Sequence, residues 1–250
     1  MKAIYIFFFL FFLNLNAQFR FIYEYKYSTD SIDLSVKKQD LYHLDFWHGE
    51  SIFYQVAKLE KDKVNTNENL FSEFDYIIQK NNTTGIKQYS NISNFEYEIT
   101  ENPQLNWKIK AQKSKYMDYD VQQAIIEYKG RSWKALFAPS ISVFDGPYKF
   151  YGLPGLIVKI SDRSNTHQFT LKAIQPLPNK TEICKKQRLQ ISPKQFNKIV
   201  VGYRNSSQKE LQNIDIVSTE DGISGEEFQK RMRDYYRRKS KRENNFIEKE

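Results

Sequence analysis

A chain of 250 residues, of which 40% are hydrophobic and 27% are charged, can bury a sizeable core, and we expect one large domain. This balance excludes wholesale disorder, and the lone cysteine, Cys184, excludes an intramolecular disulfide. The aromatic fraction of 16%, with 19 Phe and 17 Tyr against 9 Gly, favours half-buried β-strands.

The first 17 residues have the order of a secretory signal peptide. Lys2 precedes an apolar run from Ile4 to Leu13, and the segment ends in the small residue Ala17. The run is well short of the roughly 20 apolar residues that span a bilayer as a helix. We therefore predict cleavage after Ala17 and export to the periplasm, the outer membrane or the medium, with no transmembrane span in the mature chain.

Alternation of aromatic and polar residues predicts many short strands from residue 19 onward. In the first strand, Phe19 and Tyr23 share one face, while Arg20 and Glu24 point to the other. Similar patterns lie at residues 41–47, 51–56, 84–90, 94–99, 106–110, 124–128, 131–137, 155–160 and 167–174. Close turns separate them, so over residues 18–225 we predict a mainly β domain: a single curved antiparallel sheet, a meander or half-barrel, with a few short helices.

Three segments follow helical spacing instead. The first, residues 67–78, carries apolar side chains three and four positions apart. The second, residues 192–203, has a proline in its first turn. The third, residues 223–238, contains a capping-box pattern near its start, and we predict a basic C-terminal helix and tail over residues 226–250.

A glycine and proline motif marks a sharp corner between two predicted strands. Pro154 and Gly155 suit the two central positions of a type II turn, because proline presets the first and glycine supplies the positive φ of the second. The strand that follows would place Leu156, Val158 and Ile160 inward. We interpret the motif as structural; its six residues are Gly152, Leu153, Pro154, Gly155, Leu156 and Ile157.

This hexapeptide, GLPGLI, is the signature that names a bacterial protein family, and other segments of the chain are similar to that family as well. They include FIYEYKYSTDS near the start, YKGRSWKA and GPYKF around the motif, and NNFIEKE at the end. Because these segments cover nearly all of the predicted mature chain in order and spacing, the protein resembles the GLPGLI family. The resemblance implies export, a compact β-rich domain and a Gram-negative source, with an accessory role beside TonB-dependent outer-membrane receptors but no established reaction.

The histidines do not form the pattern of a metal site. On a strand, His43 and Asp45 would share a face, whereas His48 would point to the other. The sequence has no nucleotide-binding or hydrolase motif, so we assign no metal, no cofactor and no catalytic residue. Carboxylates flank the central strands, and we interpret them as solvated surface charge, with a catalytic pair in a hydrolase as the alternative. They are Asp118, Asp120, Glu127, Asp145 and Asp162.

The strongest functional candidate outside the motif is a basic stretch near the C-terminus. Its basic residues are Lys230, Arg231, Arg233, Arg237, Arg238, Lys239, Lys241 and Arg242. Together with Asp234 they carry the whole net charge that remains once Lys2 leaves with the signal peptide. We interpret the stretch either as a solvated helix face or as a site for an anionic envelope surface, such as lipid headgroups, lipopolysaccharide phosphates or an acidic partner loop. The sequence has no nucleic-acid-binding module, so we expect no nucleic-acid partner.

These observations favour an exported, non-enzymatic binding or accessory protein of the cell envelope. A curled sheet would offer an aromatic concave face to an apolar ligand or to a partner such as an outer-membrane receptor. The alternative is an envelope hydrolase that acts on peptide or glycan through a carboxylate pair, and a third is a structural envelope component. The short sequence around Ser31 also resembles an O-glycosylation acceptor of such exported proteins.

Overall fold

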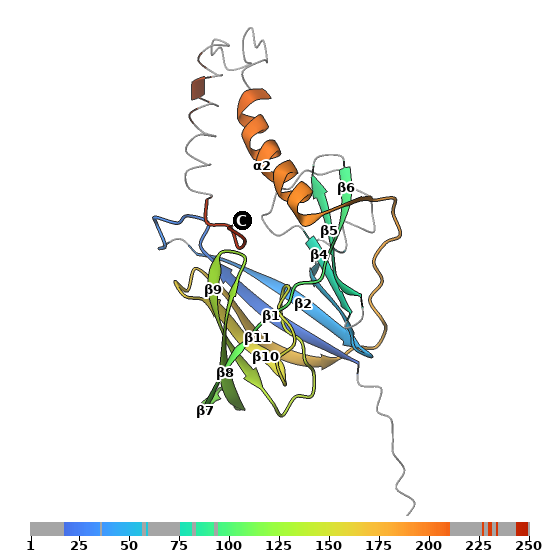
Figure 1. Ribbon diagram of the computed structural model, residues 1–250, viewed down its shortest axis with the longest axis vertical. Helices are drawn as coiled ribbons and strands as arrows, with labels where there is room; N and C mark the ends of the chain where they lie inside the picture. The colour runs from blue at the N-terminus through green and yellow to red at the C-terminus, as the bar shows by residue number, and fades with distance from the viewer. Residues whose placement is uncertain are drawn as a thin grey trace, which may run out of the picture.

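The computed structural model describes residues 18–35, 37–56, 59, 76–81, 84–92, 95–210, 227, 230, 231, 234 and 244–249. Within these residues the chain forms one 12-stranded sheet and one long helix (Figure 1). The sheet confirms the prediction of a mainly β fold on a single curved, largely antiparallel sheet. In the described ranges, no helix has the length and apolarity that crossing a bilayer requires.

Most strands follow one another through short connections. The elements in chain order are β1 (Phe19–Tyr27), β2 (Lys38–Trp47), β3 (Glu50–Gln55), β4 (Tyr76–Asn81), β5 (Gly85–Ile92), β6 (Phe95–Glu101), β7 (Lys108–Tyr116), β8 (Tyr119–Tyr128), β9 (Arg131–Ala138), β10 (Leu156–Asp162), β11 (His167–Pro176), β12 (Leu189–Ile191) and the helix α2 (Pro193–Glu210). Each predicted strand overlaps an observed one, whereas alternation in the sequence predicts neither β4 nor β12.

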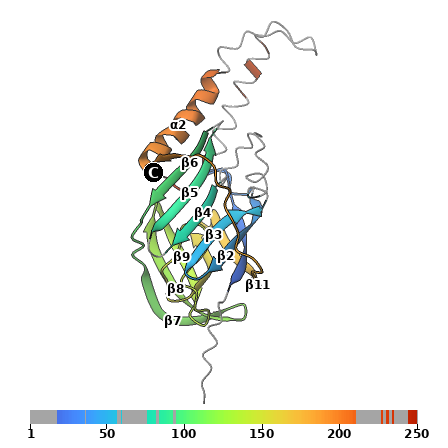
Figure 2. The same ribbon diagram turned by 90° about the vertical axis from the view of Figure 1, so that its right-hand side faces the viewer.

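The sheet joins two antiparallel meanders side by side. One runs from β1 to β6 and the other from β7 to β11, and the pairing of β1 with β11 connects them. Among the described strands, β12 makes the only parallel pair, against β6, and β7 forms the opposite edge. The sheet curls strongly, so that β7 to β9 and β4 to β6 stand on opposite sides of a packed interior (Figures 1 and 2).

The inner face of the sheet holds the main core. Phe21, Tyr23 and Tyr25 on β1 are fully buried in it, as their alternation predicts. The ring of Tyr25 stacks on that of Phe169 with 4.2 Å between centroids, because the two residues are partners in the pairing of β1 with β11. Burial of each such side chain contributes roughly 1.5–3 kcal/mol, so the aromatic alternation is a main source of the stability of the fold.

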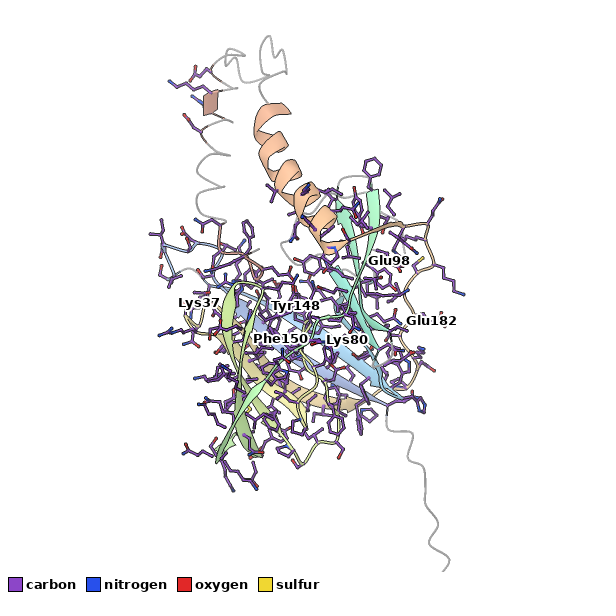
Figure 3. The ribbon with its side chains drawn as sticks, in the orientation of Figure 1. Lys37, Lys80, Glu98, Tyr148, Phe150 and Glu182 are labelled. Carbon is purple, nitrogen blue, oxygen red and sulfur yellow. The ribbon has the colours of Figure 1, made fainter. Side chains whose placement is uncertain are left out.

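The loop between β9 and β10, residues 139–155, folds back into this core. Tyr148 and Phe150 are at most 2% exposed and lie between the two halves of the sheet (Figure 3). The interior that we expected to offer an open aromatic face is therefore occupied by the chain itself. The reason is that this loop carries its own large apolar residues, which bury more surface inside the sheet than outside it.

The GLPGLI motif forms a corner at the end of that loop, but the predicted type II turn is wrong. The Gly155 N–H donates to the Leu153 carbonyl at 2.8 Å and closes a three-residue turn around Pro154. The Leu156 N–H, which a type II turn would bond to Leu153, bonds elsewhere in the loop. Gly155 has a φ of 147°, and a Cβ there would lie 2.3 Å from the Ala138 carbonyl oxygen. Close backbone approach therefore requires this glycine.

The helix predicted at residues 192–203 is confirmed. The Ser192 hydroxyl accepts from the Gln195 N–H at 3.3 Å, and the Gln195 side chain accepts from the Ser192 N–H at 2.9 Å, which caps α2. Phe196 packs against Tyr97 of β6 with 6.1 Å between ring centroids and fixes the start of the helix on the sheet. The helix predicted at residues 223–238 is described at four helical positions, Glu227, Lys230, Arg231 and Asp234.

The helix predicted at residues 67–78 is wrong in its described part. Residues 76–78 begin β4, and residues 67–75 lie outside the described part of the chain. Ile78 packs in the main core, whereas Ile77 packs in a second cluster on the outer face. A strand that is buried on both faces lacks the alternation by which it could be identified, and its apolar run then fits helical spacing equally well.

The last described residues, 244–249, also pack into the inner core. Ile247 is 2% exposed there, and the Asn245 N–H donates to the Thr29 carbonyl at 3.0 Å. The basic helix and tail predicted over residues 226–250 thus ends in a segment that belongs to the packing of the β domain.

Candidate functional site

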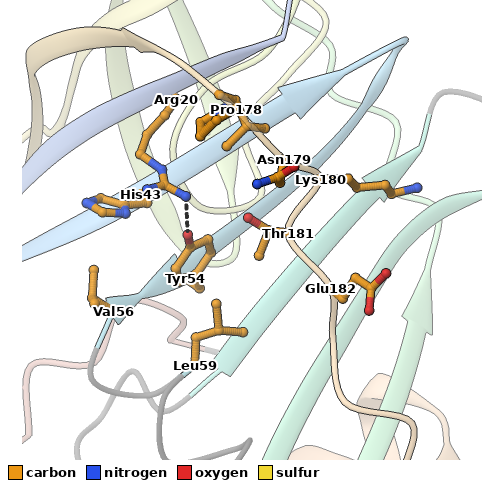
Figure 4. A pocket seen from close by; sticks show the side chains of 11 residues that line it. Arg20, His43, Tyr54, Val56, Leu59, Pro178, Asn179, Lys180, Thr181 and Glu182 are labelled. Atoms are coloured by element: carbon orange, nitrogen blue, oxygen red, sulfur yellow. Dashed lines mark hydrogen bonds between the residues drawn. The ribbon is translucent and has the colours of Figure 1, made fainter.

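A cavity of about 510 Å³ lies on the outer face of the sheet, opposite the main core (Figure 4). Its floor comes from β1, β2 and β3, and one wall comes from the connection between β11 and β12, residues 177–188, which we call the strap. The strap crosses the outer face of the β1–β6 half of the sheet (Figures 1 and 2). The lining residues used below are Arg20, His43, Tyr54, Val56, Leu59, Asn179 and Thr181.

Strand register places the polar floor residues side by side. Arg20 of β1 is the cross-strand partner of Asp45 on β2, and His43 is the partner of Tyr54 on β3. Asp45 and His43 share a face of β2, as the alternation of a strand predicts, and in the structure this is the outer face. His48 lies apart from them, in the turn after β2, with a φ of 46°.

A buried carboxylate organises the floor of the cavity. Asp45 is 0% exposed and accepts from the Arg20 guanidinium twice, at 2.7 Å from Nε and 2.8 Å from Nη2. It also accepts from the Tyr54 hydroxyl at 2.9 Å and from the hydroxyl of Thr181 on the strap. Four donors satisfy the two carboxylate oxygens, which offsets the cost of burying the charge. The bond to Thr181 also ties the strap to the floor.

Burial and pairing fix the protonation states of the other floor residues. The hydrogen bond to Asp45 raises the pKa of the Arg20 guanidinium above its usual value. Burial raises the pKa of Tyr54 to about 12, and the charge of Asp45 acts in the same direction. Burial lowers the pKa of His43, and the charge of Arg20 lowers it further. At neutral pH the floor therefore presents a charged guanidinium, a neutral phenol and a neutral imidazole.

Two nitrogen atoms at the floor have no protein partner among the described residues. His43 Nδ1 is buried without a hydrogen bond. The bonds of the Arg20 guanidinium all use Nε and Nη2 and leave Nη1 unused. A buried polar atom without a partner costs roughly 1–3 kcal/mol, so His43 Nδ1 calls for an explanation. The Arg20 side chain, in contrast, is 28% exposed. Both side chains line the cavity, and a bound molecule would supply a partner for Arg20 Nη1.

The strap is anchored beyond Thr181 as well. At its start, the Leu177 N–H donates to the Gln18 carbonyl at 3.0 Å, and the Leu177 side chain is buried in the outer cluster. Next to the cavity, the Lys180 ammonium lies 4.6 Å from the centroid of the Trp47 ring and 3.1 Å from the Glu50 carboxylate. These contacts hold the cavity wall in place, and none of them uses Arg20 Nη1 or His43 Nδ1.

A second cluster of ionisable side chains lies inside the sheet. Lys149 contacts Glu101 at 2.5 Å and Glu248 at 2.7 Å, and Lys129 lies 3.6 Å and 4.0 Å from the same two carboxylates. Burial alone would raise the pKa of Glu248, but the charges of Lys149 and Lys129 hold it below its usual value. Glu248 is thus kept as an anion, whereas a general acid needs a raised pKa.

Two of the five carboxylates that we interpreted as solvated are buried. Asp145 is 6% exposed and pairs with Lys80 at 2.5 Å, and Asp162 is 3% exposed and pairs with Arg131 at 2.8 Å. Each cation comes from a distant part of the chain, so no local pattern predicts the pairing. The other three are exposed as predicted; they are Asp118, Asp120 and Glu127.

The structure describes only part of the predicted basic site. Arg231 pairs with Glu227 one helical turn earlier, at 2.7 Å, and Lys230 is also helical. The remaining residues, Arg233, Arg237, Arg238, Lys239, Lys241 and Arg242, lie outside the described part of the chain. Ser31 is exposed, and its N–H donates to the Asn244 side chain at 2.9 Å. Across the described ranges, no three His, Cys, Asp or Glu side chains gather closely enough to hold a metal ion.

The sequence pattern predicts the shared face of His43 and Asp45 but not the cavity. Thr181 reaches Asp45 across 136 positions of the chain, and alternation in the sequence does not predict that contact. The available signal is Asp45 itself, because a carboxylate between two apolar residues of a strand needs a partner when it is buried. Arg20 supplies that partner from the neighbouring strand.

Comparison with known proteins gives a fold but no family. No family model and no curated protein matches the chain significantly. PNGF-II in space groups P21 and C2 resembles it, in each case with a TM-score of 0.56 and 12% identity over 75% of this chain. The match covers 34% of PNGF-II in P21 and 33% in C2, so this chain spans about a third of that protein's length. Such a likeness shows a shared fold alone, and the resemblance to the GLPGLI family stays a prediction.

Proposed function

We propose that this protein is an exported, non-enzymatic binding protein of the bacterial cell envelope and that the outer-face cavity is its binding site. The observation that carries the proposal is the cavity itself, whose floor holds a partly exposed Arg20 with Nη1 unused among the described residues. The volume of about 510 Å³ lies in the range of small-molecule sites. The anchored strap holds the wall of the cavity in a fixed geometry, which favours binding.

The buried carboxylates give little support to the alternative, a hydrolase that acts on peptide or glycan. Such an enzyme needs one carboxyl group that stays protonated near neutral pH. Among the described residues, Asp45 is paired with Arg20 and Glu248 with Lys149, and the charge of Lys149 helps to hold the pKa of Glu248 below its usual value. The described geometry therefore supports binding better than carboxylate-pair hydrolysis.

The binding proposal is tested by filling the cavity. Asn179→Trp adds an indole on the strap side and removes no hydrogen bond found in the described residues. Ligand-observed NMR against a library of small polar metabolites compares the wild type, this variant and the control Glu127→Trp, at an exposed position of β8. We expect compounds that bind the wild type and the control but bind Asn179→Trp about tenfold more weakly or worse. A library that binds all three proteins equally would contradict the proposal.

We also propose that the basic stretch, residues 230–242, attaches the protein to an anionic envelope surface or to an outer-membrane receptor. Phe196 fixes α2 on β6 before the stretch, and Ile247 fixes the chain in the core after it. The described chain is therefore anchored to the domain both before and after the stretch. This tethering supports a docking role over that of a free tail.

The attachment is tested by changing the eight basic residues to glutamine while keeping residues 243–250, because a truncation would remove Ile247 from the core. Co-sedimentation with vesicles that contain anionic lipid is compared with that of neutral vesicles, at low and high salt. We expect the wild type to bind anionic vesicles in a salt-sensitive way and the neutralised variant to lose that binding. Unchanged binding would remove the stretch from the proposal.

A further inference from the structure

A band of lysines crosses the outer face of the sheet from the edge strand β7 to β1. In sheet order these strands are β7, β8, β9, β10, β11 and β1, and each of them except β8 contributes a lysine to the band. Neighbouring strands lie about 4.8 Å apart, so the band is roughly 24 Å long. We call these lysines the basic band; they are Lys108, Lys134, Lys159, Lys172 and Lys26.

Alternation and register place the basic band on the outer face. Lys134 lies between Trp133 and Ala135, which are both buried in the main core, so its side chain points away from that core. Lys108 and Lys134 are both cross-strand partners of Ile125 on β8, and opposite residues share a face. The band lysines of β1 and β10 also stand between core residues, and that of β11 contacts an outward carboxylate of β1. Distant segments of the chain thus form a basic surface that no local charge run predicts.

Few carboxylates compensate the basic band. Glu24 is shared, because it pairs with Lys172 at 3.0 Å and with Lys26 at 3.2 Å. Glu127 is exposed on β8, two positions beyond Ile125, and forms no ion pair within the described ranges. The band lysines that have no ion pair among the described residues are Lys108, Lys134 and Lys159. The surface therefore keeps an excess of positive charge.

The edge strand β7 extends this basic surface along one side. The strand carries no carboxylate, and its three further lysines are exposed; they are Lys110, Lys113 and Lys115. Asp118 and Asp120 follow in the turn and at the start of β8, at the end of the hairpin away from Lys108. These two carboxylates therefore lie beyond the basic band and do not neutralise it.

The surface between the band lysines is polar or half-buried. Gln123 and Gln168 present half-buried amides on this face, and Ile125 and Leu136 are only partly exposed. None of the exposed large hydrophobic side chains of the described residues lies between the band lysines. The face thus offers ammonium groups for anions and amides that both donate and accept hydrogen bonds.

Two other anionic partners fit the basic band less well. The sheet curls strongly, so its outer face is convex, and a flat bilayer would meet only part of the band (Figures 1 and 2). The band also lacks the exposed apolar side chains that enter a bilayer surface. Single-stranded nucleic acid needs open aromatic rings on which its bases stack. At the band, the ring of Tyr116 lies under the Lys159 ammonium, 5.2 Å from its centroid.

From the unpaired charge, the amides and the convex shape we infer that the basic band binds a linear acidic polysaccharide. The carboxylate or sulfate groups of such a chain pair with the ammonium groups, and its hydroxyls bond to the amides. A linear chain can follow the curved face from β7 to β1, which a flat surface cannot. The basic band is separate from the outer-face cavity and from the basic stretch, so this inference goes beyond the proposed function.

The inference is tested by isothermal titration calorimetry on the full mature chain. In every protein used, the basic stretch is neutralised by the eight glutamine substitutions described above, so that it contributes no attraction. The acidic probes are polygalacturonate and dextran sulfate, and dextran is the neutral probe. We expect both acidic polymers to bind at low salt and to bind more weakly at high salt, and we expect dextran not to bind.

Matched changes of charge measure the contribution of the basic band. The band variant combines Lys108→Gln, Lys134→Gln and Lys159→Gln. It should bind the acidic polymers at least about tenfold more weakly, because it loses three ionic contacts. The control variant loses the same charge at exposed positions of the strap and α2, through Lys185→Gln, Lys194→Gln and Lys198→Gln. Its affinity should stay within about twofold of the starting protein.

Four results would overturn the inference. They are acidic polymers that do not bind, dextran that binds as tightly as they do, a band variant that binds as tightly as the starting protein, and a control variant that loses as much affinity as the band variant. Anionic vesicles provide the comparison with a membrane: vesicle binding that the band variant loses, without binding of the polymers, would assign the band to a bilayer instead. The cavity is unchanged and the basic stretch is neutralised throughout, so failure here leaves the proposed function standing.

Discussion

Two arginine and aspartate pairs lie on opposite faces of the same sheet and are completed in different ways. On the inner face, Arg131 bonds to Asp162 at 2.8 Å and also to Asn245 at 2.6 Å, and its side chain is 4% exposed. On the outer face, Arg20 bonds to Asp45 at 2.7 Å, but its side chain is 28% exposed and its Nη1 has no partner in the described part of the chain.

This contrast separates a structural role from a binding role. A buried network whose donors are all used rigidifies a fold, whereas a paired group with a donor left over can recognise a ligand. The C-terminal segment, residues 244–249, completes the inner pair, while the strap covers the outer pair without completing it. Substitutions on the inner face should therefore cost stability, and substitutions in the outer cavity should cost binding.

The largest effect is expected for Arg131→Met. Removing this cation leaves Asp162 buried without its charge partner and releases Asn245, so the free energy of unfolding should fall by about 3–5 kcal/mol. Urea unfolding measures the loss, with Lys134→Met as the control because Lys134 is exposed on the same strand. The control should stay within about 0.5 kcal/mol of the wild type. A similar small change for Arg131→Met would contradict the structural role of the inner pair.

The next effect compares two glycines, one in the packed interior and one on the open surface. In Gly155→Ala the new Cβ would lie 2.3 Å from the Ala138 carbonyl oxygen, and we expect a loss of about 3 kcal/mol. Gly202 lies in α2, where a Cβ would meet no atom of the described residues within 4 Å, so Gly202→Ala should raise helix stability by up to about 1 kcal/mol. Thermal unfolding of both variants checks that Gly155→Ala lowers stability and Gly202→Ala raises it. A change in the same direction in both variants would contradict the prediction.

The third prediction concerns acid pH and the buried His167. Burial lowers its pKa to about 3, and the charge of Arg131 acts in the same direction. Between the ordinary histidine pKa of about 6.5 and that value, the unfolded chain binds a proton that the folded chain does not, so stability falls as pH falls. From pH 7.5 to 4.5 the loss should be about 3 kcal/mol. His167→Phe should show a clearly smaller loss of stability over that range. If the unfolding free energy of the variant and the wild type falls equally with pH, His167 is not its source.

The smallest effect is expected for His43→Leu in the outer cavity. Because His43 Nδ1 is buried without a partner among the described residues, removing it should raise the free energy of unfolding by about 1 kcal/mol. Urea unfolding of this variant beside Gln123→Leu measures the gain. A clear loss of stability would show that His43 serves the fold and would weaken the contrast between the two faces.

Alternation in the sequence predicts most of the fold because it reports directly which side chains face the core. It identifies β1 through Phe21, Tyr23 and Tyr25, and it fails at Ile77 and Ile78, where both faces of a strand are buried. The same local pattern places His43 and Asp45 on one face. It does not reveal the cavity, because the wall is built by the strap from far along the chain, nor the burial of Asp145 and Asp162, because their cations are equally distant.

The central claim, that the outer cavity binds a ligand, is tested most directly by following the three histidines of the chain by imidazole NMR. His43 lines the cavity, His48 lies in a turn outside it, and His167 is buried in the inner core. On titration with a bound compound, the account predicts a large shift of the His43 nitrogen signals and none for His48 or His167. A compound that binds the mature protein without moving His43, or that moves His167 instead, would contradict it.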